Sequence, residues 1–183
     1  MIQLFENTPY RRDKDLVKAY NSFMELLPDD GWALFRDADT LFLDSFYGET
    51  ILKAIEDNPD TDCFTCLTNR IGCPIQKHSE YKGDDIIKHR EIANKLKSVK
   101  PEYINFPKDS TLMSGMLFVL SKKAWDKIGG LKKHPNVNNN ILGVDNKLHL
   151  DLLKNKFKIK VIKNLYIYHW YRGGNMSDTK HLL

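Results

Sequence analysis

Short apolar runs that suit strands alternate with helix-type repeats along the chain, and this alternation constrains the fold more than any other feature of the sequence. Between Leu16 and Leu27 the apolar residues recur every three or four positions, which predicts an amphipathic helix that ends before Pro28. Trp32–Phe35 follows an Asp-Asp-Gly turn as a compact apolar run, which is typical of a buried strand. The alternation predicts an α/β fold with a mostly parallel central sheet that is flanked by helices on both faces.

The other elements are predicted from the same patterns. Ser121 is a typical N-cap, and Gly129–Gly130 is a typical end of the helix that follows it. With 183 residues, no internal repeat and no linker-like segment, the chain is expected to form one domain, 1–183. Further strands are expected at Ile2–Glu6, Cys63–Thr68, Met113–Leu120, Phe157–Ile162 and Leu165–His169, and further helices between Phe46 and Ile55, between Ile86 and Leu96, from Ser121 to Ile128 and from Gly143 to Leu153.

The composition argues against several classes of protein. The 28 basic and 24 acidic residues give a formal charge of +4, which is too small to predict a nucleic-acid partner. The longest apolar stretch, Met113–Leu120, is far shorter than the roughly 20 residues of a membrane helix, so no membrane span is expected. The N-terminus lacks the basic and apolar regions of a secretory signal, so we expect a cytoplasmic protein.

Three cysteines and a histidine raise the question of a structural zinc site. Cys63, Cys66, Cys73 and His78 are formally four soft ligands for a tetrahedral zinc ion. However, Cys63 and Cys66 lie three positions apart in a predicted strand, so their side chains should point to opposite faces. Buried cysteines that fill small volumes of the core are the alternative. An odd number of cysteines also favours reduced thiols in a cytoplasm-like compartment.

Two carboxylates follow the predicted strand Trp32–Phe35. Asp37 and Asp39 would repel each other, so one of them would be pushed toward protonation unless a divalent cation relieved the repulsion. Open α/β sheets bind ligands beyond the carboxyl ends of their strands, and His169 ends the last predicted strand. Taken singly, the acidic pair could be a solvated turn, His169 a core histidine, and Asp145 a stabiliser of a helix N-terminus.

Several segments, taken in order, resemble the GT-A fold glycosyltransferases, especially glycosyltransferase family 2. Trp32–Phe42 matches the family's strand with its Asp-x-Asp motif. Lys14–Asn21 matches the helix before that strand, which ends in Ala-x-Asn. The Ser-Gly strand and Ile-Gly-Gly loop are matched within Met113–Leu131. Gly143–Asn146 and Tyr168–Trp170 match the acidic motif and the late metal-binding histidine. The resemblance covers nearly the whole chain from about residue 3 and implies one GT-A-like, Rossmann-like domain.

The resemblance implies a metal-dependent transferase that moves a sugar from a nucleotide-sugar, first of all a UDP- or GDP-sugar, to a hydroxyl of a carbohydrate or other acceptor. Asp37 and Asp39 would hold Mn²⁺ or Mg²⁺ against the donor diphosphate, and His169 would complete the protein ligands. Asp145 would be the general base, which implies inversion at the anomeric carbon. Asn146, or a carboxylate elsewhere, could occupy the acceptor site instead.

The resemblance also implies contacts with the donor and the acceptor. Gly115 would let the backbone approach the donor sugar closely. The proposed donor contacts are Asn7, Thr8, Lys18, Asn21, Arg36, Ala38, Ser114 and Gly115, and the acceptor or lid residues are Gly143, Asn146, Trp170 and Arg172. Asn69–Arg70 and the segment from Asp84–Asp85 to His89–Arg90 either belong to the acceptor region or form helix caps and surface pairs.

The sequence departs from the family at its N-terminus, where it is shorter than a full GT-A domain. Ile2–Glu6 could serve as the first strand of a minimal domain, the missing part could come from another chain, or donor binding could be lost. The competing function is therefore a catalytically inactive module that binds a carbohydrate or nucleotide, or a subunit of a larger assembly. A metal-dependent phosphoesterase or nuclease is a third possibility, although no second metal cluster is evident.

Overall fold

Seven strands form one open, mixed sheet in the computed structural model, which describes residues 1–107, 111–136 and 143–170. The strand order is β1-β2-β6-β4-β7-β3, and β5 pairs with β7. The strands are β1 (Leu4–Asn7), β2 (Trp32–Arg36), β3 (Thr40–Phe42), β4 (Cys63–Thr68), β5 (Tyr103–Asn105), β6 (Leu117–Ser121) and β7 (Ile159–His169). The α-helices are α1 (Leu16–Met24), α2 (Tyr47–Asp57), α3 (Ile86–Lys97), α4 (Lys122–Ile128) and α5 (Val144–Lys154), with a 3₁₀ turn at Pro74–Gln76.

The direction of the strands differs from the prediction. β2 pairs in parallel with β1, and β4 with β7, whereas β3, β5 and β6 pair antiparallel with their neighbours. The α/β class is confirmed, but the prediction of a mostly parallel sheet is wrong. All five residues of β6 are buried, and a strand that is covered on both faces has the same apolar sequence whichever way it runs.

Most element boundaries agree with the sequence patterns. The Ser121 side chain caps α4 by accepting a hydrogen bond from the Ala124 N–H at 3.1 Å, and Gly129 ends that helix with a φ of 71°. Two expected strands, Phe157–Ile162 and Leu165–His169, are a single strand, β7. The segment expected as the first strand forms β1 at the edge of the sheet, beside β2.

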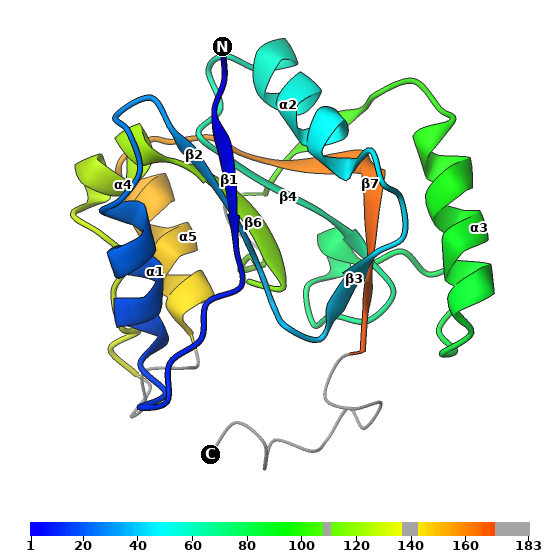
Figure 1. Cartoon of the computed structure of the whole chain (residues 1–183), viewed down its shortest axis with the longest axis horizontal. Helices are drawn as coiled ribbons and strands as arrows, with labels where there is room; N and C mark the ends of the chain where they lie inside the picture. The colour runs from blue at the N-terminus through cyan, green and yellow to red at the C-terminus, as the bar shows by residue number, and fades with distance from the viewer. Residues whose placement is uncertain (108–110, 137–142, 171–183) are drawn as a thin grey trace.

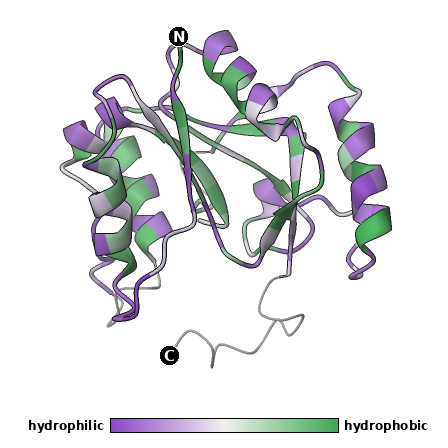
Figure 2. Cartoon of the chain, in the orientation of Figure 1, coloured by the Kyte–Doolittle hydropathy of each residue, from purple (hydrophilic) through white to green (hydrophobic). Residues whose placement is uncertain are grey.

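Helices cover both faces of the sheet. Figure 1 shows α1, α4 and α5 gathered on one side, and α2 and α3 on the other. The rings of Phe35 and Phe118 pack against Tyr20 of α1, and their centroids lie 4.8 Å and 5.5 Å from the centroid of the Tyr20 ring. Apolar residues accordingly follow the strands and the inner sides of the helices, while polar residues lie on the outer sides (Figure 2). Among the described helices, the longest of which has 12 residues, none has the length and apolarity of a membrane span.

β7 carries a bulge near its middle. β4 pairs Cys66 with Ile162 but pairs its next residue, Leu67, with Tyr166, so the segment 163–165 loops out of the β4–β7 ladder. Such bulges redirect side chains away from the positions of a regular strand. The strand then continues to His169, which lies at the edge of the sheet where β2 and β4 also end.

Candidate metal centre

The predicted acidic pair and His169 meet at the carboxyl edge of the parallel strands. Asp37 directly follows β2, and its N–H donates to the Met116 carbonyl at 2.9 Å, which continues the ladder with the chain that enters β6. A tight turn follows, in which the Thr40 hydroxyl and N–H both donate to the Asp37 carbonyl, at 2.6 Å and 3.2 Å. Thr40 pairs with His169 in the β3–β7 ladder. The turn therefore places Asp37 and Asp39 beside the end of β7.

One potential ligand atom from each of Asp37, Asp39 and His169 lies within 4.8 Å of the other two. His169 is buried, with 3% of its side chain exposed, whereas the Asp39 side chain is 36% exposed. The Trp170 N–H donates to the Asp39 carbonyl at 2.9 Å and fixes the loop against the end of β7. The arrangement is open on one side, so it could hold a cation that keeps positions for a further ligand.

The position of the His169 ring is defined by its Nδ1 atom. Nδ1 lies 3.0 Å from the Arg70 carbonyl oxygen, and because a carbonyl only accepts hydrogen bonds, Nδ1 carries the proton. Nε2 then faces Asp39 Oδ1 at 3.3 Å. A lone pair on Nε2 and a carboxylate at this distance repel each other unless a proton or a cation lies between them. A divalent cation would satisfy both groups, and the hydrogen bond at Nδ1 is the kind that orients metal-binding histidines.

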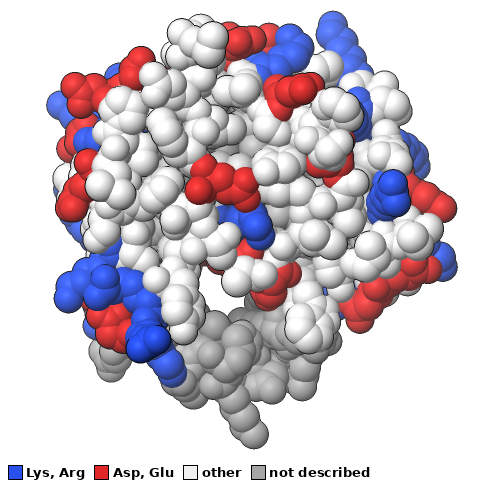
Figure 3. All heavy atoms as spheres, in the orientation of Figure 1, with Lys and Arg blue, Asp and Glu red and all other residues white. Residues whose placement is uncertain are grey.

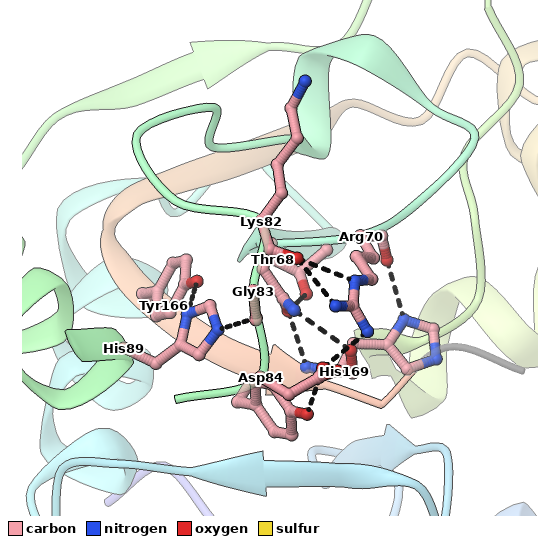
Figure 4. A network of polar contacts seen from close by, with 10 residues as sticks. Thr68, Arg70, Lys82, Gly83, Asp84, His89, Tyr166 and His169 are labelled. Atoms are coloured by element: carbon pink, nitrogen blue, oxygen red, sulfur yellow. Dashed lines mark hydrogen bonds and ion pairs between the residues drawn. The ribbon is translucent and has the colours of Figure 1, made fainter. Parts of the chain in front are cut away.

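Asn69, directly after β4, fixes the backbone of His169. Its side-chain oxygen accepts from the His169 N–H at 2.8 Å, and its side-chain nitrogen donates to the His169 carbonyl at 3.2 Å. Asn69 is fully buried. Figure 4 shows the neighbouring bond between His169 and the Arg70 carbonyl. Asn69 and Arg70 thus contact a candidate metal ligand directly.

Arg70 and the segment 82–89 support the same strand end. The Arg70 guanidinium forms an ion pair with Asp84 at 2.6 Å and donates to the Lys82 carbonyl at 2.7 Å (Figure 4). His89 is buried and bridges the Tyr166 hydroxyl and the Gly83 carbonyl, at 2.7 Å and 2.8 Å. Asp85 caps α3. The expectation of caps and surface pairs is therefore confirmed for Asp84 and Asp85, whereas His89 is a buried residue within α3.

Burial and neighbouring charges alter the acidity of the two most enclosed carboxyl groups. The pKa of Asp37 is raised to about 7, chiefly by burial; His169 acts to lower it, and the negative charges of Asp39 and Asp145 act to raise it. Burial also raises the pKa of Asp145, while hydrogen bonds from the Asn146 and Gly115 N–H groups lower it. Asp145 is therefore near enough to influence Asp37, although it is not one of the three converging residues.

Asp145 is held by the loop that leads into β6. Gly143 begins α5 with a φ of 76°, and the carboxylate of Asp145 in the first turn accepts from the Gly115 N–H at 2.7 Å and the Asn146 N–H at 2.8 Å. A Cβ atom on Gly115 would lie 2.8 Å from the Asp145 Cβ. Gly115 thus lets the backbone approach Asp145, which is a reason for glycine here that sequence reasoning missed.

Two of the predicted donor contacts, Asn21 and Arg36, already have partners within the protein. The Asn21 side chain accepts from Trp125 Nε1 and the Leu131 N–H, at 2.8 Å and 2.9 Å, and donates to the Leu131 carbonyl at 3.0 Å. This leaves at most one N–H of Asn21 for a ligand. Arg36 forms an ion pair with Glu6 at 2.7 Å.

The other predicted contacts lie at or near the carboxyl edge. Asn7 ends β1 opposite Phe35, and Thr8 follows it. Ser114 is clamped through its backbone by the buried Gln76 side chain, with hydrogen bonds of 2.8 Å and 2.9 Å. Ala38 lies exposed between the two acids, and Asn146 follows Asp145. Lys18 lies in the first turn of α1, with its ammonium 3.8 Å from the Asp15 carboxylate. Trp170 is 52% exposed. Arg172 lies outside the described residues.

The zinc alternative is not supported. Cys63, Cys66 and Cys73 are buried free thiols, and burial raises the pKa of each of them, which disfavours the thiolate that a metal needs. His78 pairs with Glu80 at 3.3 Å instead. Within residues 1–107, 111–136 and 143–170, Asp37, Asp39 and His169 are the only group whose ligand atoms converge.

Fold and site together define an α/β protein with a candidate divalent-cation site at the carboxyl edge of a mixed sheet. No protein-family model matches this chain, and no curated protein is significantly similar to it. On the face in Figure 3, acidic and basic groups lie interspersed over the described surface, which agrees with the small net charge.

Proposed function

We propose that this protein is a metal-dependent glycosyltransferase that moves a sugar from a nucleotide-sugar to an acceptor hydroxyl. The observation that carries the proposal is the convergence of Asp37, Asp39 and His169, with a third carboxylate, Asp145, close by. The order of the matching sequence segments supports the same reaction. Hydrolysis of a phosphoester would use similar acids, but the described residues offer no second converging metal cluster.

The donor set suits Mn²⁺ better than Mg²⁺. Carboxylate oxygens bind both ions, but an imidazole nitrogen is a better ligand for Mn²⁺ than for Mg²⁺, which strongly prefers oxygen. When bound, the metal would stabilise the negative charge that develops on the leaving nucleoside diphosphate. Asp37 and Asp39 would hold the ion, and Arg70 and Asn69 would keep Nε2 of His169 directed at it.

Asp145 is the proposed general base. Burial raises its pKa, and a carboxylate with a raised pKa accepts a proton more readily from an attacking hydroxyl. The hydrogen bond from Gly115 holds Oδ2 in place. Attack on the anomeric carbon from the side opposite the leaving diphosphate would invert its configuration. Asn7 and Thr8, at the same edge of the sheet, are proposed contacts for a UDP or GDP moiety.

The test combines donor binding with transfer. Thermal shifts are measured with UDP-, GDP-, CMP- and dTDP-sugars, with and without Mn²⁺, since a ligand that binds only the folded state raises the Tm. We expect a Mn²⁺-dependent shift with one nucleotide class that Asp39→Ala abolishes. Asp145→Asn should keep the shift and lose transfer to acceptor hydroxyls. Asp60→Asn, which alters an exposed carboxylate paired with Lys158, is the matched control and should keep both.

The outcomes separate the alternatives. Donor binding without transfer to any acceptor, in both the wild type and Asp145→Asn, would favour the inactive binding module. Metal-dependent cleavage of phosphoesters without sugar transfer would favour the phosphoesterase. No donor shift at all would contradict the proposed donor site.

A further inference from the structure

Tyr20 is a buried titratable side chain that the proposed mechanism does not use. It lies in α1, and only 5% of the residue is exposed. Its ring packs against Phe35 and Phe118, which pair with each other across β2 and β6. Phe35 meets the ring edge-on, with the two ring planes at 88°. The sheet therefore fixes the position of the Tyr20 ring and leaves its hydroxyl as the group that can take part in chemistry.

The Tyr20 hydroxyl lies near two carboxylates of the proposed reaction. Asp37 stands two positions beyond Phe35 and continues the β2–β6 ladder, so its side chain points to the face that the Tyr20 ring covers. Asp145 comes from α5, which lies on the same side of the sheet as α1 (Figure 1). Burial, and then the negative charges of Asp37 and Asp145, raise the pKa of Tyr20 well above its ordinary value. Because Coulomb energies fall with distance, both carboxylates lie close to the phenol.

The Tyr20 hydroxyl forms no hydrogen bond within residues 1–107, 111–136 and 143–170. The enclosed side-chain atoms that lack a hydrogen bond in this part of the chain belong to Arg70, Asp151 and Asn164, so the Tyr20 oxygen is not sealed off from solvent. A hydroxyl in so enclosed a position normally has a partner. The raised pKa keeps its proton in place. Tyr20 therefore offers an uncharged hydrogen-bond donor beside Asp37 and Asp145.

The proposed reaction brings the transferred sugar to this donor. Asp37 would hold the diphosphate through the bound cation, and Asp145 would act from the opposite side of the anomeric carbon, so the sugar would lie between them. A neutral phenol has no charge to attract a phosphate past two carboxylates. A sugar hydroxyl, in contrast, can accept from the phenol and donate to a carboxylate. We infer that Tyr20 is a specificity-determining residue whose hydroxyl donates a hydrogen bond to a hydroxyl oxygen of the transferred sugar, an inference that rests on the proposed transferase function.

The inference is tested on the full chain with Tyr20→Phe, which removes the hydroxyl and keeps the ring that packs on Phe35 and Phe118. Isothermal titration calorimetry with Mn²⁺ compares UDP-glucose, UDP-galactose, UDP-N-acetylglucosamine and GDP-mannose with UDP and GDP alone. We expect Tyr20→Phe to bind the best nucleotide-sugar about two- to tenfold more weakly, as for one lost hydrogen bond, and the corresponding diphosphate as the wild type does. Without ligand, its Tm should equal or exceed that of the wild type, because the hydroxyl has no partner among the described residues.

Tyr103→Phe is the matched control. The Tyr103 hydroxyl, on β5, donates to Asp57 at 2.8 Å, so this variant should bind every ligand as the wild type does. The inference is overturned if Tyr20→Phe and the wild type bind the nucleotide-sugar equally, or if binding of the nucleotide-sugar and of the diphosphate weakens alike. A lower Tm of Tyr20→Phe would also overturn it, because the hydroxyl would then have a structural role. A wild type that binds neither nucleotide-sugars nor diphosphates would instead contradict the proposed donor site itself, and the inference with it.

Discussion

Asn69 and His169 are joined by two hydrogen bonds, in which one buried side chain satisfies both the N–H and the carbonyl of the other residue. Asn69 directly follows β4, and His169 ends the neighbouring parallel strand β7, so the contact holds the ends of the two strands together. The imidazole of His169 is then directed by the Arg70 carbonyl. Asn69 thus acts as a positioning residue for the candidate metal centre.

Asn69→Ala should weaken metal binding as well as the fold. Losing the amide leaves two buried backbone groups without partners, and we expect the free energy of unfolding to fall by about 1–3 kcal/mol. Without the clamp, His169 is no longer held beside Asp39, so the Kd for Mn²⁺, measured by electron paramagnetic resonance, should rise at least tenfold.

The control for Asn69→Ala is Asn58→Ala. Asn58 is also buried, and its side chain donates to the Ala54 carbonyl at 2.8 Å and accepts from Lys160 at 2.5 Å, away from the metal centre. This variant should lose stability and keep its Mn²⁺ affinity. An unchanged Mn²⁺ affinity in Asn69→Ala would remove the positioning role.

The wild type should bind Mn²⁺ more tightly than Mg²⁺. The reason is the imidazole of His169, so His169→Gln should reduce the difference between the two ions, as measured by isothermal titration calorimetry. His78→Gln is the matched control, because His78 is partly exposed, pairs with Glu80 and is not among the converging residues, so it should not affect either ion. Equal preference for Mn²⁺ in His169→Gln and wild type would show that the histidine is not a ligand.

Stability without metal should depend on pH through Asp37. The pKa of Asp37 is raised from 3.8 to about 7 in the folded protein, so between about pH 4 and 7 the folded state keeps a proton that the unfolded chain releases. The contribution of this group to stability therefore falls as the pH rises through that window and stays constant above it. Asp37→Asn removes the effect, and its Tm relative to the wild type should increase from pH 4.5 to pH 7.5 in the presence of a chelator.

The control for this pH dependence is Asp60→Asn, whose Tm relative to the wild type should stay constant from pH 4.5 to pH 7.5. Lys158 lowers the pKa of Asp60, so the carboxylate stabilises the folded state above its ordinary pKa, and the variant loses that contribution. A Tm difference for Asp37→Asn that stays constant with pH would contradict the raised pKa. With metal present, the stabilisation by Mn²⁺ should be larger at pH 7.5 than at pH 5.5, since the ion binds the ionised carboxyl group.

Gly115→Ala should disturb Asp145. The new methyl group would lie 2.8 Å from the Asp145 Cβ, so either the loop or α5 must move, at a cost of about 1–3 kcal/mol. We expect a lower Tm in thermal melts and a loss of sugar transfer greater than the loss of donor binding.

Gly48→Ala is the matched control for Gly115→Ala. No atom lies within 4 Å of a Cβ at Gly48, and this residue is in α2, where alanine is favoured over glycine by about 0.5–1 kcal/mol. The control variant should be as stable as the wild type or more stable. Similar Tm values for Gly115→Ala and wild type would contradict the close approach to Asp145.

The convergence of Asp37, Asp39 and His169 could be expected from the sequence because each of them lies at or directly after a strand end. Asp37 and Asp39 directly follow a strand that its apolar run identifies, and His169 ends another. Parallel strands bring such ends to one edge, but the contact itself depends on β3, which pairs Thr40 with His169. The structure brings these three residues together as the prediction requires.

Other features depend on contacts that the sequence does not encode locally. Asn69 follows β4 at the same edge, but nothing in its neighbours indicates that its amide binds the backbone of a residue 100 positions away. β3 and β5 have three residues each, too few to give an alternating pattern, and both were missed. The bulge at 163–165 divided β7 into two predicted strands, because it interrupts the apolar pattern of one continuous strand.

The reversed direction of β6 has a consequence for the polarity of the site. Because β6 is antiparallel to β2, the chain enters β6 at the edge where β2 ends. There the Gly115 N–H donates a hydrogen bond to the carboxylate of Asp145. Had β6 run parallel to β2, Gly115 would have preceded the strand at the opposite edge, and its N–H would not have met Asp145. The orientation of a strand of five residues thus determines which backbone group holds the acid that α5 contributes here.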